Sequence, residues 1–205
     1  YAEHGIIRDC ELGGVKALRE CRHIVLDNCR IQSTEFGWNC TDVTVTGGRL
    51  ESEYVFMGSR DVTIRDWQFK GKYSFQYVDN LTIENSVLDT KDALWHCRNV
   101  VVRNCTVKGE YLAWYSENLR LENCRIIGTQ PFCYCKNLQL VNCTMEEADL
   151  AFECSEVDAD VHGRIISIKN PMAGTIVVDE VGEIIIENPV RPTDCRVILR
   201  EAKEA

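Results

Sequence analysis

Aromatic, acidic and histidine side chains recur at a regular interval in the middle of this 205-residue chain. Several of the rings follow a 19-residue period, as Tyr77, His96 and Tyr115 do. Aromatic rings stack on the apolar faces of sugars and anchor protein interfaces, and a carboxylate beside them can accept hydrogen bonds from hydroxyl groups. We therefore predict a ligand-binding face that consists of Tyr73, Phe75, Tyr77, Asp92, His96, Tyr111, Tyr115, Phe132 and Tyr134.

The same region contains the candidate catalytic residues Asp149, Glu153 and His96. Two carboxylates can act as acid and base on a glycosidic bond, here with assistance from His96. Asp92 lies three repeat units before Asp149, which in a stack of strands corresponds to about 14 Å and is too far for this chemistry. The sequence therefore favours a non-catalytic binding function, with a polysaccharide lyase or glycoside hydrolase as the alternative.

Two further interpretations of the aromatic positions stay open at this point. The rings can form an interface, either between copies of the chain or with another protein, or they can stack on one another and stabilise neighbouring repeats. The net charge of -9 at pH 7 argues against nucleic acid and anionic membranes as partners, because both attract Lys and Arg. No apolar run approaches the ~20 residues that a membrane span requires.

A 19-residue repeat determines where all of these residues fall. Phrases such as HIVLDNCRI at His23–Ile31 and NLRLENCRI at Asn118–Ile126 begin once in every repeat from His23 to Asn137. Apolar residues alternate within each phrase, which is the period of a strand. The alternation breaks at a column of Asn, Asp and Gly that includes Asn28, and a second column includes Asn99. These residue types tolerate a left-handed backbone, so both columns predict corners.

The segment between two phrases also alternates and therefore predicts a third strand in each repeat. At Leu94–Cys97 this pattern places Ala93, Trp95 and Cys97 inside, and the aromatic columns, with Phe56, Phe75, Leu94 and Phe132, outside. Three strands and three corners predict an all-β, right-handed, single-stranded parallel β-helix of triangular coils, in which Asn side chains form ladders. We expect one domain over residues 1–205, with regular coils over 5–156 and irregular C-terminal coils and a cap over 157–205.

The twelve cysteines fit this repeat better than they fit a disulfide framework. Most of them share two columns whose other members are small, for example Gly48, Ser59 and Ser116. Cysteine behaves there as a small buried side chain, so we expect free thiols, a reducing compartment and a cytoplasmic location. Cys133 and Cys135 lack two further converging ligands in sequence, and we predict neither a metal site nor a cofactor.

Several stretches outside the phrases carry a resemblance to a known family. They are KDALW at Lys91–Trp95, GEYLAW at Gly109–Trp114, LAFECSEVDA at Leu150–Ala159, IKNPMAGTI at Ile168–Ile176 and VGEII at Val181–Ile185. Together they resemble an uncharacterised bacterial family of parallel β-helix proteins, known only as a domain of unknown function within the pectin-lyase-like fold class. The resemblance implies the fold over nearly the whole chain. It implies no activity, substrate or catalytic residue.

Overall fold

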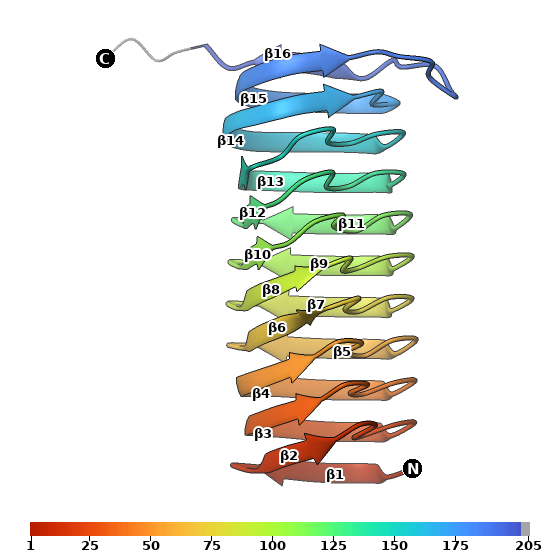
Figure 1. Ribbon diagram of the computed structural model, residues 1–205, viewed down its shortest axis with the longest axis vertical. Helices are drawn as coiled ribbons and strands as arrows, with labels where there is room; N and C mark the ends of the chain where they lie inside the picture. The colour runs from red at the N-terminus through yellow and green to blue at the C-terminus, as the bar shows by residue number, and fades with distance from the viewer. Residues whose placement is uncertain (202–205) are drawn as a thin grey trace.

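The computed structural model describes residues 1–201 and shows a straight stack of flat turns (Figure 1). The strands are β1 (Glu3–Arg8), β2 (Glu11–Gly14), β3 (Arg22–Ser33), β4 (Thr41–Ser52), β5 (Arg60–Arg65), β6 (Gln68–Lys72), β7 (Asp79–Glu84), β8 (Val87–Lys91), β9 (Arg98–Arg103), β10 (Thr106–Lys108), β11 (Glu117–Glu122), β12 (Arg125–Ile127), β13 (Lys136–Glu146), β14 (Glu156–Lys169), β15 (Ala173–Ile185) and β16 (Arg196–Leu199). All pairings are parallel, and from β1 to β13 paired residues lie 19 apart, as in Ile24↔Val43 and Leu119↔Leu138. The described chain is therefore an all-β parallel solenoid, as the repeat predicts.

Each regular turn contributes to two parallel sheets. The first sheet stacks β5, β7, β9 and β11, and the second stacks β6, β8, β10 and β12. In β3, β4 and β13 a single long strand runs through both sheets (Figure 1). Alternate residues point inward, so that Val100 and Val102 of β9 are fully buried while Arg98 is exposed. The stacked inward residues form one continuous hydrophobic core.

The two predicted corners are left-handed positions. Asn104 and Asn123 have φ of 52° at the first corner, and Asn99 and Asn118 have φ of 57° at the second. Their side chains bond from turn to turn: Asn118 Nδ2 donates to Asn99 Oδ1 over 3.1 Å, and Asn123 Nδ2 donates to Asn104 Oδ1 over 3.3 Å. A left-handed residue between two short strands changes the chain direction without a loop, which explains the choice of Asn and Asp.

The third side of each turn is not the strand that its alternation predicts. Tyr73, Phe75 and Tyr77 have φ of 53°, 59° and 59°, so every second residue is left-handed. The amide N–H of Phe75 donates to the preceding turn at Val55, whereas that of Tyr77 donates to the following turn at Trp95. The segment is thus a hydrogen-bonded turn that keeps the period of a strand while it curves.

Cysteine and serine side chains connect neighbouring turns where this third side meets the first sheet. Cys97 Sγ donates to the carbonyl oxygen of Phe75 over 2.7 Å, and Ser116 Oγ donates to that of Leu94 over 2.5 Å. Ser116 Oγ also accepts the backbone N–H of Cys97 over 2.8 Å. All twelve cysteines are free thiols. Cys and Ser share this column because both are small and both hydrogen-bond.

The regular turn ends in β14, which has no left-handed Asn at either corner position. The sequence offset between paired residues of β14 and β15 is 17 at Val157↔Gly174 and 16 at Ile165↔Val181. Residues Ile184 and Ile186 at the end of β15 and beyond it are 50% and 54% exposed. Within residues 1–201, no helix covers this end of the stack.

Candidate functional site

Four rings form an outward stack along the third side, at the last left-handed position of successive turns. Tyr77 and His96, His96 and Tyr115, and Tyr115 and Tyr134 have ring centroids 5.0, 5.0 and 4.6 Å apart, with interplanar angles of 3°, 7° and 6°. Tyr77 is 55% exposed and Tyr115 45% exposed. We call these four residues the aromatic ladder. The structure therefore places four of the nine predicted binding residues in one outward row.

The orientation of the rings determines what the aromatic ladder can contact. Each inner ring has a neighbouring ring on both of its faces, so its edge and its polar atoms are the parts that reach solvent. A sugar stacks on the face of a ring, and in this row only the outer faces at the two ends lack a stacked ring. Beyond Tyr77 the next position of the column is Gly58.

Half-buried tryptophans hold the aromatic ladder from behind. Trp95 and Trp114 stack on each other with centroids 5.4 Å apart at 5°, and Trp114 also contacts the rings of Tyr115 and Tyr134 edge-on. The indole Nε1 of Trp95 donates to the carbonyl oxygen of Tyr111 over 2.6 Å. Because the backing rings are anchored to the backbone of the next turn, the ladder is a preorganised surface.

The first position of the third side, which is left-handed at Tyr73, Asp92 and Tyr111, carries a second, more buried row. Tyr54 and Tyr73 stack with centroids 5.1 Å apart, and the Lys72 ammonium lies 5.6 Å from the Tyr73 ring. Tyr111 packs edge-on against Trp114. Asp92 is only 8% exposed, and burial, together with the nearby carboxylate of Glu110, raises its pKa. Tyr73, Asp92 and Tyr111 therefore belong to a separate row and are not members of the aromatic ladder.

The prediction that Phe56, Phe75, Leu94 and Phe132 point outward is wrong, since all four side chains are at most 1% exposed. Phe75 stacks on Phe56, and Phe132 stacks on Phe152 with centroids 5.9 Å apart. The reason is the curvature of the left-handed turn. Phe75 and Tyr77 are two residues apart, yet Phe75 points into the core and Tyr77 points to solvent, which a straight strand would not allow.

The three catalytic candidates have separate structural contacts. Glu153 pairs with Lys169 of β14 at 3.1 Å, and Asp149 accepts a hydrogen bond from the Thr129 hydroxyl. His96 lies between two tyrosine rings of the aromatic ladder. Each of the three side chains contacts a different neighbour, and none of these contacts joins two of the candidates into an acid–base pair.

A row of alternating charge borders the aromatic ladder and was missed in the sequence. It lies two residues after the ladder and consists of Arg60, Asp79, Arg98, Glu117, Lys136 and Glu156. Arg98 Nε and Nη2 donate to the two carboxylate oxygens of Asp79 over 2.9 and 3.0 Å, and Lys136 Nζ donates to Glu117 over 2.9 Å. These bonds lower the pKa of Asp79 and of Glu117. The signal was available, because the first five members alternate in sign at 19-residue intervals in the sequence, and Glu156 follows Lys136 after 20 residues.

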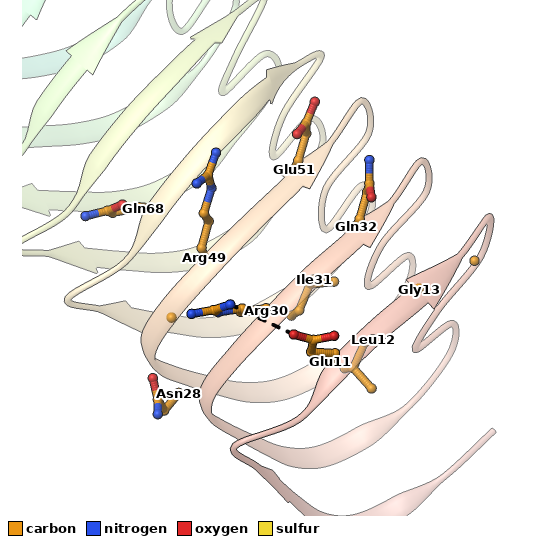
Figure 2. A pocket seen from close by; sticks show the side chains of 12 residues that line it. Glu11, Leu12, Gly13, Asn28, Arg30, Ile31, Gln32, Arg49, Glu51 and Gln68 are labelled. Atoms are coloured by element: carbon orange, nitrogen blue, oxygen red, sulfur yellow. Dashed lines mark ion pairs between the residues drawn. The ribbon is translucent and has the colours of Figure 1, made fainter.

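A broad hollow lies on the second sheet at the N-terminal end, across β2, β3, β4 and β6 (Figure 2). Its outward side chains include Glu11, Arg30, Arg49 and Gln68, and they project away from the solenoid (Figure 2). The Arg30 and Glu11 side chains pair at 3.9 Å while 81% and 84% exposed. This is a solvated sheet face, and such an exposed pair contributes little binding energy.

Over residues 1–201 no group of three or more His, Cys, Asp and Glu side chains is placed to hold a metal ion. Cys133 and Cys135 are buried, and burial raises the pKa of Cys135 to about 12, which disfavours the thiolate that a metal would need. The described residues include no helix with the length and apolar character needed to cross a membrane.

Comparison with known proteins yields one family. The family described as "Protein of unknown function (DUF3737)" matches residues 1–198. No curated protein matches the chain.

Proposed function

Because the chain belongs to the DUF3737 family of unknown function, we propose a function from the solenoid itself: a non-catalytic scaffold that binds a protein partner through the aromatic ladder. The observation that carries this proposal is the exposed four-ring stack on a tryptophan backing. Tyrosine and tryptophan dominate the energetic centres of protein interfaces, particularly where they are held rigidly before binding. A solenoid wall offers such a rigid, extended surface.

Ring orientation favours a protein over a carbohydrate. The inner faces of the aromatic ladder are already stacked, and what remains exposed is a line of ring edges and tyrosine hydroxyl groups. Edges and hydroxyls suit carbonyl groups, hydroxyls and other ring edges, which a protein surface supplies. The contacts of Asp149 and Glu153 with Thr129 and Lys169 support the non-catalytic assignment.

Site-specific photocrosslinking tests this function in the cells that produce the protein. A photoreactive phenylalanine analogue is placed at Tyr115, and in a matched control at Lys108, which is exposed on the second sheet. We expect protein crosslinks from position 115, identified by mass spectrometry, that are lost when Tyr77→Ala and Tyr134→Ala are added. Crosslinking at position 115 that does not exceed position 108 would contradict a protein-binding face.

Carbohydrate binding is the second candidate, favoured by one observation: the column continues from Tyr77 to Gly58, which has no side chain, so one face of the terminal ring is not stacked on another. Titration with a panel of oligosaccharides, followed by tyrosine and tryptophan fluorescence, separates the two candidates. A saturable change that Tyr77→Ala removes supports sugar binding, and a flat response across the panel refutes it.

The cysteine contacts support a proposed cytoplasmic location. Thiols such as Cys97 donate to backbone oxygens of the neighbouring turn, and oxidation would remove these donors. The count of reactive thiols after denaturation without reductant tests this, and a count far below twelve in protein prepared from its native source would place the chain in an oxidising compartment.

A further inference from the structure

We infer that the partner of the aromatic ladder is a second copy of this chain, packed antiparallel about a two-fold axis that passes between the turns of His96 and Tyr115. The inference rests on the proposed function, since it names the occupant of that same face. It is carried by the row of alternating charge beside the ladder, which we call the charge row.

The charge row is complementary to its own reverse. Read along the stack, Arg60, Asp79, Arg98, Glu117, Lys136 and Glu156 alternate in sign over six turns. Backbone pairing places the first five in direct succession, and the N–H of Glu156 donates to Cys135 beside Lys136. Because the row has six members of alternating sign, reversing one copy places the first member opposite the sixth, the second opposite the fifth and the third opposite the fourth, and the two charges of each pair have opposite signs.

An antiparallel copy therefore brings each charge opposite its counter-charge. Arg98 of one copy faces Glu117 of the other, Asp79 faces Lys136, and Arg60 faces Glu156. The side chains of Arg98 and Lys136 are 61% and 60% exposed, so they are available to a partner in addition to their bonds within the chain. Complementary charges around an aromatic centre mainly fix orientation and register and exclude wrong arrangements.

The same two-fold axis places the aromatic ladders of the two copies opposite each other. Tyr77 meets Tyr134 of the other copy, and His96 meets Tyr115, because the ladder and the charge row come from the same turns. The groups that meet are the ring edges, the tyrosine hydroxyls and the nitrogen atoms of His96, which can exchange hydrogen bonds with the hydroxyls. A C2 interface requires such a self-complementary patch.

The charge row also favours this dimer over two alternatives, an antiparallel dimer shifted by one turn and a parallel dimer. A shift of one turn, about 4.8 Å, opposes Asp79 to Glu117 and Arg98 to a second Arg98, so that every pair becomes repulsive. A parallel arrangement about an axis along the stack places the two charge rows on opposite borders of the face. Of these arrangements, only the antiparallel dimer with its axis between two turns places charge row against charge row with opposite signs and aromatic ladder against aromatic ladder.

Charge reversal tests the inference on the full chain. We expect the wild type to sediment as a dimer at about 100 µM, and Arg98→Glu and Glu117→Arg each to weaken dimerisation at least about tenfold, because each creates two like-charge contacts per dimer. An equimolar mixture of the two variants is expected to restore dimers, since positions 98 and 117 are both negative in one variant and both positive in the other. Native mass spectrometry identifies these as heterodimers by mass.

The double variant R98E/E117R separates contacts between chains from contacts within one. It restores opposite charges across the axis but places a glutamate beside Asp79 and an arginine beside Lys136 in the same chain, where the wild type has ion pairs of 2.9 Å. We expect dimerisation like that of the wild type together with a lower Tm. Far-ultraviolet circular dichroism of every variant establishes that the solenoid is folded.

Three results would overturn the inference. They are a monomeric wild type at about 100 µM, homodimers that the Tyr115→Ala substitution leaves unchanged, and a variant mixture that forms no heterodimer. A monomer that still crosslinks to another protein through position 115 would refute self-association and leave the proposed function intact. Loss of the crosslinks as well would refute both.

Discussion

Phe75 and Tyr77 are two residues apart in one turn, and their replacement by alanine is expected to have very different effects on stability. Phe75 is 0% exposed and contacts the rings of Phe56 and Phe69, with centroids 6.3 and 5.8 Å away. Tyr77 is 55% exposed and stacks on His96 alone. If the third side were a strand with the parity that the sequence predicts, both residues would face solvent and both substitutions would be mild.

The expected magnitudes follow from burial. Phe75→Ala removes a fully buried ring and leaves a cavity between stacked turns, which costs about 3–5 kcal/mol. Tyr77→Ala loses one stacking contact and a partly buried ring, about 1 kcal/mol. With a urea slope of about 2 kcal/mol/M, the midpoint falls by roughly 2 M for Phe75→Ala and by roughly 0.5 M for Tyr77→Ala.

Equilibrium urea unfolding, followed by circular dichroism, measures both shifts, and equal slopes for the variants make the midpoints comparable. Phe75→Gly supplies a further check on the backbone. At the φ of 59° found for Phe75, glycine avoids the left-handed strain, so this variant is expected to be about 1 kcal/mol more stable than Phe75→Ala. In a strand the order would reverse. Equal losses for Phe75→Ala and Tyr77→Ala, or a glycine variant less stable than the alanine variant, would refute the left-handed turn.

Three other substitutions test separate features of the wall by thermal denaturation. Ser116→Ala leaves the buried N–H of Cys97 and a carbonyl oxygen without their partner, which costs about 1–3 kcal/mol per group, whereas Ser116→Cys is expected to retain most of the stability. Asp92→Asn is expected to raise the Tm at pH 7, because burial raises the pKa of this carboxyl above its unfolded value and the ionised form destabilises the fold. The wild type becomes more stable as the pH falls toward the unfolded pKa, so the Tm difference between Asp92→Asn and the wild type is expected to be smaller at pH 4 than at pH 7. An equal Tm difference at the two pH values would contradict the proposed effect of burial. Gly109→Ala places a Cβ 1.9 Å from a carbonyl oxygen of the preceding turn and is expected to cost about 2–4 kcal/mol, while Gly13→Ala, with 3.8 Å of clearance, is the control.

The two Asn corners were predictable because their cause is local. Asn, Asp and Gly tolerate positive φ, and a column of them that recurs once in every repeat indicates a left-handed corner wherever it occurs. Inward positions such as Val100 and Val102 follow equally from the alternation within a phrase. The parallel register was predictable as well, because stacked turns must align equivalent columns.

The third side was not predictable in the same way. Its left-handed positions hold Tyr73, Phe75 and Tyr77, residue types that rarely adopt positive φ. Their backbone is held by N–H groups that donate to the turns on both sides, so its conformation depends on neighbours that a local pattern does not contain. A period of two is common to a strand and to this turn, and the pattern therefore could not distinguish them.

Whether the third side is a straight strand or a left-handed turn determines which rings the candidate site exposes. A straight strand would have exposed the faces of Phe75 and Phe132, a surface suited to sugars, whereas the curved turn buries these rings and leaves a row of edges backed by Trp95 and Trp114. The proposed self-association depends on the left-handed turn, because this turn places the exposed rings of the aromatic ladder directly beside the charge row. The candidate site is therefore a property of the stack: each of the four turns from Tyr77 to Tyr134 supplies one ring and one charge, and only their stacking produces a continuous surface.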